Sequence, residues 1–337
     1  MPKKRKLTLQ QRRRIAEQRN SIETDTRSNH ANSSLGDLRP GLIAAHYGTE
    51  VVVDDGQLQQ RCFFRANLEL AVGDNVQWRP SEDGLGVVES RGDRSTLIQR
   101  PDSYGALRTV GANISQMLIT ISPEPEPHSA LIDRYLVSAE YHHIHALLLL
   151  NKCDLPGAAQ LDELLSRYSQ LGYDTLKVSA QTQAGLPELL RKLNAHTSIF
   201  VGQSGVGKSS LVQMLLPGEN IRIGELSEAE AKGRHTTTHS QLYRFPSGGL
   251  CIDSPGIREF GLWHTQRSDV IHGFKEIFEY AQRCKFRDCS HNSEPGCAVL
   301  NAVDSGEIHP ERFQSFQLIL SQLDDVTIKT QDKLKKK

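Results

Sequence analysis

The chain has 337 residues, 37% of them hydrophobic and 24% charged, and its 40 basic residues are balanced by 40 acidic ones. This length allows two or three domains with proper cores, and the zero net charge excludes attraction of nucleic acid by a global field, which leaves local basic clusters for that role. The longest apolar runs are far shorter than the roughly 20 residues of a membrane span, and no apolar signal core follows the N-terminus, so we expect a cytoplasmic protein.

Residues 1–38 are rich in Lys and Arg and poor in apolar side chains. Such a segment buries too little apolar surface to offset its ordering entropy, which predicts a disordered arm. The arm is either an RNA-contacting segment or a solvated tail, and Lys3 to Lys6 also resembles a nuclear-localisation patch.

Residues 39–101 contain short runs that are typical of β-strands, separated by Asp/Gly turns. These runs are residues 42–46, 50–53, 61–65, 74–79 and 86–89. A series of short strands of this kind predicts a small barrel of the oligonucleotide-binding (OB) type.

Residues 102–265 alternate apolar strands with amphipathic helices, which indicates a mostly parallel sheet covered on both faces. The expected strands are residues 116–121, 146–150, 174–178, 198–201 and 250–252. The expected helices are residues 129–139, 161–171, 186–193 and 208–216.

A glycine-rich segment lies between the strand that ends at Val201 and the helix that follows. A strand and a helix on either side are the context of a true phosphate-binding loop, and they disfavour a plain glycine-rich turn. We expect Lys208 to neutralise β- and γ-phosphate charge, and the Ser209 hydroxyl to bind Mg²⁺. The loop residues expected to bind nucleotide are Gly202, Gln203, Ser204, Gly205, Val206, Gly207, Lys208, Ser209 and Ser210.

A second motif, Asn151-Lys152-Cys153-Asp154, follows the strand 146–150. Asp154 can accept hydrogen bonds from the ring N–H and the exocyclic amine of guanine, a pattern that adenine lacks. Asn151 would brace the phosphate loop and contact guanine, and the Lys152 stem would cover the base. Ser179 and Ala180, after the strand 174–178, resemble an accessory guanine loop. The Asn151 motif and the Ser179–Ala180 loop together predict that the site selects GTP over ATP.

The base-reading motif precedes the phosphate loop in this chain, whereas a Ras-like GTPase has the opposite order. The order therefore indicates a circularly permuted GTPase. Two switch segments should follow the phosphate loop: a Thr-rich stretch at 232–239, and Asp253-Ser254-Pro255-Gly256. We assign Mg²⁺ binding to Thr237, with Thr238 the next candidate, and γ-phosphate sensing to the Gly256 N–H; Asp253 would reach Mg²⁺ through water.

Ile257 occupies the position at which Ras-like enzymes carry the Gln that orients the attacking water. Because an apolar side chain cannot orient water, we expect slow intrinsic hydrolysis. The hypothesis is that His235 positions the water once a partner orders the loop; a group supplied by that partner is the alternative.

Residues 266–337 open with a cluster of cysteines and a histidine, continue into a helical pattern and end in a basic tail at 333–337. Three thiolates and one imidazole form a closed ligand set for one structural zinc ion, and unpaired core cysteines are the alternative. The expected ligands are Cys284, Cys289, His291 and Cys297.

The combined motif order, the preceding barrel and the following Cys/His cluster resemble the ribosome small-subunit-dependent GTPase A (RsgA/YjeQ) family over nearly the whole chain. The resemblance implies a bacterial factor that binds the small (30S) ribosomal subunit and its rRNA late in maturation. It also implies that the subunit stimulates GTP hydrolysis and that hydrolysis releases the factor.

Two further functions remain open at this point. A GTP-gated RNA-binding or anti-association factor with negligible turnover would be consistent with Ile257. A signalling or membrane GTPase is less consistent, because the chain lacks a lipidation motif. We expect a monomer without a membrane partner.

Overall fold

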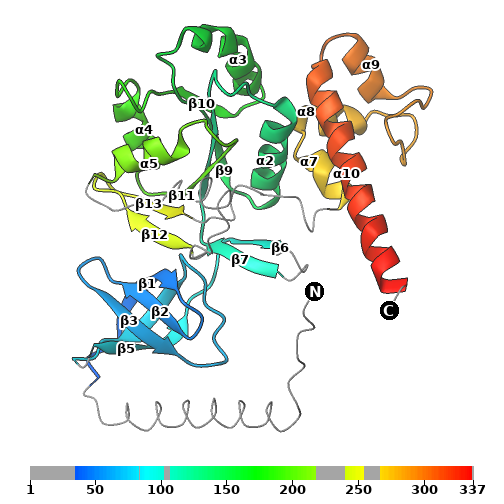
Figure 1. Cartoon of the computed structure of the whole chain (residues 1–337). Helices are drawn as coiled ribbons and strands as arrows, with labels where there is room; N and C mark the ends of the chain where they lie inside the picture. Colours follow the sequence, from blue (N-terminus) through cyan, green and yellow to red (C-terminus); the bar gives the residue numbers. More distant parts are fainter. Residues whose placement is uncertain (1–34, 83, 102–106, 218–239, 254–265, 336–337) are drawn as a thin grey trace, which may run out of the picture.

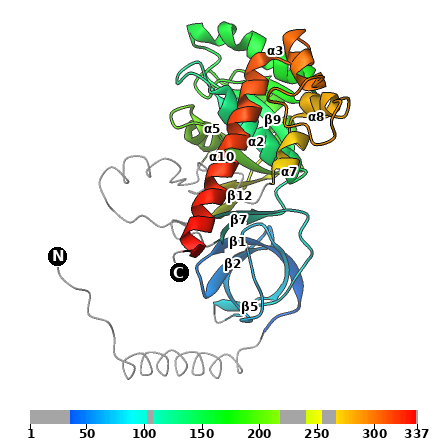
Figure 2. The same ribbon diagram turned by 90° about the vertical axis from the view of Figure 1, so that its right-hand side faces the viewer.

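The computed structural model describes residues 35–82, 84–101, 107–217, 240–253 and 266–335. They form a barrel, an α/β unit and a C-terminal helical unit, and the C-terminal unit lies beside helix α2 (Ser129–Tyr141) of the α/β unit (Figure 1). Figure 2 shows the barrel at the opposite end of the molecule from helix α3 (Asp162–Gln170). Among the described residues, no helix has the length and apolar character to cross a bilayer.

The N-terminal barrel has five strands, as the sequence predicts: β1 (Arg39–His46), β2 (Glu50–Asp54), β3 (Gln59–Phe64), β4 (Asn75–Arg79) and β5 (Leu85–Arg91). The strand order is β1-β2-β3-β5-β4, and the pairing of β1 with β4 closes the barrel. The pair β3 and β5 is parallel, and the other neighbouring strands are antiparallel. Alternate residues such as Val51, Val53 and Trp78 point inward and are fully buried. The OB-type barrel is thereby confirmed.

The α/β unit has the sheet order β10-β9-β8-β11-β13-β12. The strands are β8 (Gln116–Ile121), β9 (His145–Leu150), β10 (Asp174–Lys177), β11 (Thr197–Val201), β12 (Gln241–Arg244) and β13 (Leu250–Asp253). All neighbours within this unit are parallel except β12 and β13, which are antiparallel. Every residue of β8 is buried, as expected for a strand covered on both faces.

Helices cover both faces of this sheet. Helices α2 and α3 enclose one core cluster, and α4 (Leu186–Leu193) and α5 (Lys208–Leu215) enclose the other. The helix expected over 161–171 is α3, and a 3₁₀ turn, η2 (Pro156–Leu161), precedes it. Pro156 stands at the start of this turn, where its missing N–H costs no hydrogen bond.

A hairpin of β6 (Leu97–Pro101) and β7 (Leu107–Ala112) connects the barrel to the α/β unit. The division that the sequence suggests between residues 101 and 102 lies inside this hairpin. Strand β1 also pairs with β12, and Arg244 forms an ion pair of 2.9 Å with the buried Asp54. The barrel is therefore joined to the α/β unit by both hydrogen bonds and charge.

The C-terminal unit is helical, as expected. It consists of α7 (Arg267–His272), α8 (Lys275–Ala281), α9 (Ala298–Asp304) and α10 (Pro310–Lys335). Its core includes Phe274, Ile277, Phe313 and Phe316, and Val137 of α2 packs into the same cluster. Helix α2 therefore contributes to two cores, one on each side.

Candidate nucleotide and metal sites

The two predicted nucleotide motifs lie at the carboxyl edge of the parallel sheet. The Asn151 motif follows β9, and the phosphate loop connects β11 to α5. Strands β8, β9 and β11 are consecutive in the sheet, so loops that are about 50 residues apart in the chain meet in space. This is the edge at which open α/β sheets bind ligands.

Asn151 joins the two motifs and is 1% exposed. Its side-chain amide donates to the Val206 carbonyl at 2.9 Å, and its oxygen accepts from the Ala180 N–H at 3.3 Å. A Cβ on Gly207 would lie only 2.3 Å from the Asn151 nitrogen. Glycine at 207, with a φ of +88°, is thus required by both backbone conformation and space.

Lys152 has a φ of +58° and reaches the phosphate loop from the base-reading side. Its ammonium donates to the Gly205 carbonyl at 2.8 Å and to the Glu124 carbonyl at 2.7 Å. Asp154 lies exposed in the turn that follows. The lysine holds the phosphate loop, while the carboxylate of Asp154 remains accessible to a ligand.

Ser179 is 1% exposed, and its hydroxyl accepts from the N–H groups of Gln181 at 3.2 Å and Thr182 at 3.0 Å. These bonds form the turn after β10. The turn presents Ala180 beside Asn151, so the predicted accessory loop lies next to the base-reading motif.

The phosphate loop begins at Gly202, where φ is +135°, and Gly205 has a φ of +85°. A Cβ on Gly202 would lie 2.1 Å from the Thr120 carbonyl oxygen of β8. The Lys208 ammonium donates to the carbonyls of Gly202, at 2.8 Å, and Gln203. Ser204 and Ser210 are exposed, and Ser209 is half-buried at the start of α5. The loop therefore exposes its middle part, around Ser204 and Gly205, toward solvent.

Asp253 ends β13 next to this loop, since β13 pairs with β11. The predicted residues His235, Thr236, Thr237, Thr238, Gly256 and Ile257 lie outside the described residues.

The segment after β8 belongs to this site, although the sequence reading did not include it. Glu124 supplies a carbonyl to Lys152, and Pro125 lies 3.5 Å from the position of a Cβ on Gly205. The segment with Glu124 and Pro125 follows the carboxyl end of the buried strand β8, and this position is the signal that could have identified it as part of the site.

Cys284, Cys289, His291 and Cys297 present ligand atoms that lie within 4.8 Å of one another. Cys284 Sγ is 3.9 Å from Cys297 Sγ and 3.6 Å from His291 Nδ1. Zinc–sulfur bonds of about 2.3 Å in a tetrahedron place two sulfurs about 3.8 Å apart, so the cluster fits zinc. Burial and the neighbouring thiols of Cys284 and Cys297 raise the pKa of the Cys289 thiol. Metal binding requires the thiolate form of each cysteine.

Three comparisons place this geometry among known proteins. The model of the RsgA GTPase family matches residues 91–263. The chain is 47% identical to the small ribosomal subunit biogenesis GTPase RsgA of Saccharophagus degradans, over 96% of this chain and 99% of that protein. It is 49% identical to the protein of the same name from Azotobacter vinelandii, over 95% and 98% of the two chains.

Two solved structures share the architecture. YjeQ from Thermotoga maritima has a TM-score of 0.71 and 32% identity, over 85% of this chain and 99% of that one. YloQ, described as a circularly permuted GTPase, has a TM-score of 0.68 and 26% identity, over 86% and 96%. The permuted order read from the sequence is confirmed.

Proposed function

This chain belongs to the RsgA GTPase family, and from that premise we propose that it binds the small ribosomal subunit, assists its late maturation and hydrolyses GTP in response to the subunit. Hydrolysis to GDP and phosphate then releases the protein. The observation that carries the enzymatic part is the joining of the base-reading motif to the phosphate loop by Asn151. A single ligand can therefore span both motifs.

GTP occupies the edge of the sheet with its base at Asp154 and its phosphates on the loop 202–210. Lys208 leaves the Gly202 and Gln203 carbonyls and donates to the β- and γ-phosphates. Ser209, Thr237 and Asp253 are the residues that would hold Mg²⁺, which neutralises phosphate charge when it is bound. Gly256 reports the γ-phosphate.

His235 positions the attacking water when the partner is bound, because Ile257 cannot do so. The His235→Ala variant is expected to keep its GTP affinity and to lose most of the subunit-stimulated turnover, about 100-fold or more, the range of one general base. Single-turnover hydrolysis with and without the subunit measures this. Unchanged stimulated turnover would assign the role to a group of the partner instead.

The cysteine cluster holds one structural zinc ion, with its four protein ligands leaving no open position for a catalytic water. Phe286, close to the ligands, is 42% exposed, and the Lys285 ammonium lies 5.5 Å from its ring. Aromatic rings beside basic groups are typical of contacts with unpaired RNA bases, which supports rRNA as the partner of this unit. The protein acts in the cytoplasm as a monomer.

The alternative is a GTP-gated binding factor without appreciable turnover. The test is GTP hydrolysis by the full chain with purified small subunits, with large subunits as control. We expect stimulation by small subunits alone, on the order of 100-fold, from ordering of the water-positioning group. Tight GTP-dependent binding without a rise in turnover would favour the alternative.

A further inference from the structure

Strand β12 lies between the N-terminal barrel and the strand that ends in Asp253. It pairs with β1 of the barrel on one side and with β13 on the other, so a single sheet runs from the barrel into the α/β unit (Figure 1). Gln241 connects the two pairings, because it is aligned with Ala45 of β1 and with Asp253 of β13. One strand therefore separates Asp253 from the barrel.

The other end of β12 is joined to the barrel by an ion pair. Arg244 Nε donates to Oδ2 of Asp54 in β2 at 2.9 Å, and the aspartate side chain is 5% exposed. The N–H of Gly56 donates to Oδ1 of the same carboxylate at 2.7 Å. A buried carboxylate needs such partners, because burial without them disfavours its charge. Arg244 thus holds one end of β12 to β2, while the pairing with Ala45 holds the other end to β1.

The barrel also contacts β13 directly, through the loop between β3 and β4. Gly73 of this loop has a φ of +92°, and a Cβ there would lie 2.3 Å from the Ala112 carbonyl oxygen and 3.0 Å from Ile252 Cδ1. Ile252 is 1% exposed and immediately precedes Asp253. Val72 of the same loop belongs to the core cluster that contains Ile252. At this packing density the barrel cannot shift here without moving Ile252.

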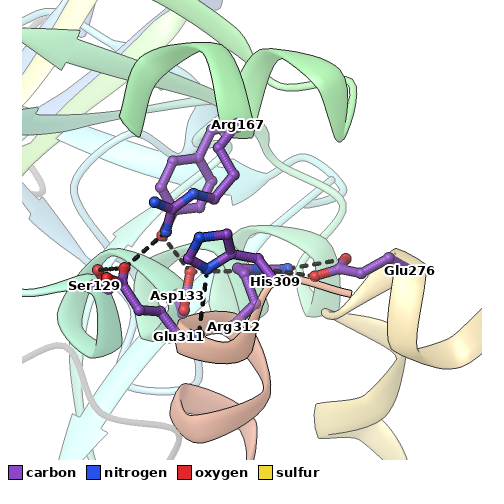
Figure 3. Close-up of polar contacts among 8 residues, drawn as sticks. Ser129, Asp133, Arg167, Glu276, His309, Glu311 and Arg312 are labelled. Carbon is purple, nitrogen blue, oxygen red and sulfur yellow. Dashed lines mark hydrogen bonds and ion pairs between the residues drawn. The ribbon is translucent and has the colours of Figure 1, made fainter. Parts of the chain in front are cut away.

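The C-terminal unit is attached at a different place. Arg167 of α3 contacts Glu311 of α10 at 2.7 Å, and the Ser129 hydroxyl of α2 donates to the same carboxylate at 3.1 Å. Figure 3 shows these three side chains beside the buried contact between Arg312 and Asp133. All of these contacts are made by helices. Among the described residues, the strand pairing that reaches β13 from a flanking unit comes from the barrel.

We propose that the barrel positions Asp253 for magnesium through β12 and the Gly73 loop, with Arg244 as a positioning residue. The inference rests on the proposed binding of GTP and magnesium, in which Asp253 would reach the ion through water. Such an outer ligand acts through the placement of its carboxylate, so the elements that hold it affect the affinity for the metal. By linkage, the seating of the barrel on β12 and the binding of magnesium strengthen each other by the same factor. A partner that binds the barrel thereby acts on the metal site.

The first experiment is a magnesium titration of the full chain with a fluorescent GTP analogue that is not hydrolysed. The variants are Arg244→Met, which keeps the aliphatic stem, and Arg244→Lys, which keeps a cation near Asp54. For Arg244→Met, the magnesium concentration at half-saturation is expected to rise about threefold to tenfold, since the coupling cannot exceed the free energy of the lost charged hydrogen bond. Arg244→Lys should recover much of this loss. The affinity for fluorescent GDP in EDTA should stay at the wild-type value, which separates a displaced metal ligand from a damaged nucleotide site.

Arg167→Met is the matched control, because it removes an arginine that joins the other flanking unit to the α/β unit. It should leave the magnesium requirement unchanged. Circular dichroism establishes that each variant is folded. If Arg244→Met does not fold, Asp54→Asn, which keeps the shape of the partner and removes its charge, takes its place.

Hydrogen exchange of the wild-type chain tests the coupling in the opposite direction. The GTP analogue with magnesium should slow the exchange of the backbone amides of β1, which belongs to the barrel. GDP in EDTA should not slow it. This measurement requires no turnover and no substitution.

An unchanged magnesium requirement in the folded Arg244→Met or Asp54→Asn variant would overturn the inference. An equal rise in Arg167→Met would also overturn it, because the effect would then reflect a general loss of stability. Exchange in β1 that does not respond to magnesium would exclude the coupling as well. A wild-type chain that binds neither nucleotide would reject the proposed function, and the inference with it; this result is distinct, because it appears before any variant is compared.

Discussion

The Asp154→Asn variant is expected to lose GTP and to accept xanthosine triphosphate. The carboxylate accepts from the ring N–H and the amine of guanine, whereas an asparagine can donate to the carbonyl that xanthine carries in place of that amine. Removing a charged hydrogen-bond partner from a site built for it costs about 100-fold or more in affinity. Competition between GTP and xanthosine triphosphate for the protein measures the change.

Asp162→Asn is the control for this variant. Asp162 starts α3, pairs with Lys177 and lies outside the two nucleotide motifs, so its amide should leave the preference for GTP unchanged. If Asp154→Asn bound GTP as tightly as the wild type, the base would have to be read elsewhere. Ser179 and Ala180 would then be the first residues to test.

The sequence predicted the elements whose residues carry one strong signal. Strand β8 and helix α4 have the predicted bounds, 116–121 and 186–193. The first is a mostly apolar segment that is buried throughout, and the second is a short helix with Leu189 and Leu193 fully buried on one face. In strand β8 and in helix α4, the structure that the local sequence pattern favours is also the one that the surrounding packing requires.

Elements whose residues carry only a weak local pattern were missed. The hairpin β6–β7 and the strand β12 have few apolar residues, and β12 exists because it pairs with both β13 and β1. Helices α7, α8 and α9 have six or seven residues each, too short for helical periodicity to be distinguished from chance. Their packing around Phe274 and Phe316 is a tertiary effect.

The residues of the candidate site also fall into those that the sequence predicted and those that it did not. The motif residues could be identified because backbone geometry restricts them, as at Gly207. Contacts with residues outside the motifs were not predictable: the Lys152 ammonium donates to the Glu124 carbonyl, and Arg312 of α10 pairs with Asp133 of α2 from 179 positions away. A sequence indicates which residue types a site needs, whereas the carbonyl that each cation contacts depends on the packed fold.

The second large effect concerns the metal cluster. The Cys297→Ser variant is expected to lose zinc and, with it, the fold of the C-terminal unit, while the GTPase unit remains folded. Cys297 is 2% exposed, caps α9 and packs in the core that includes Phe274 and Phe313. Structural zinc contributes on the order of 10 kcal/mol to folding of such units, more than the total stability of many domains. Zinc content by mass spectrometry and helical circular dichroism measure both losses.

Cys153→Ser is the control, because Cys153 is a half-buried thiol far in sequence from the cluster and outside the metal ligands. It should retain one zinc per chain. Because both nucleotide motifs lie in the α/β unit, Cys297→Ser should still bind GTP. A metal-free variant with full helical signal would instead mean that the aromatic core alone folds this unit, and that the cluster serves a partner or a different ion.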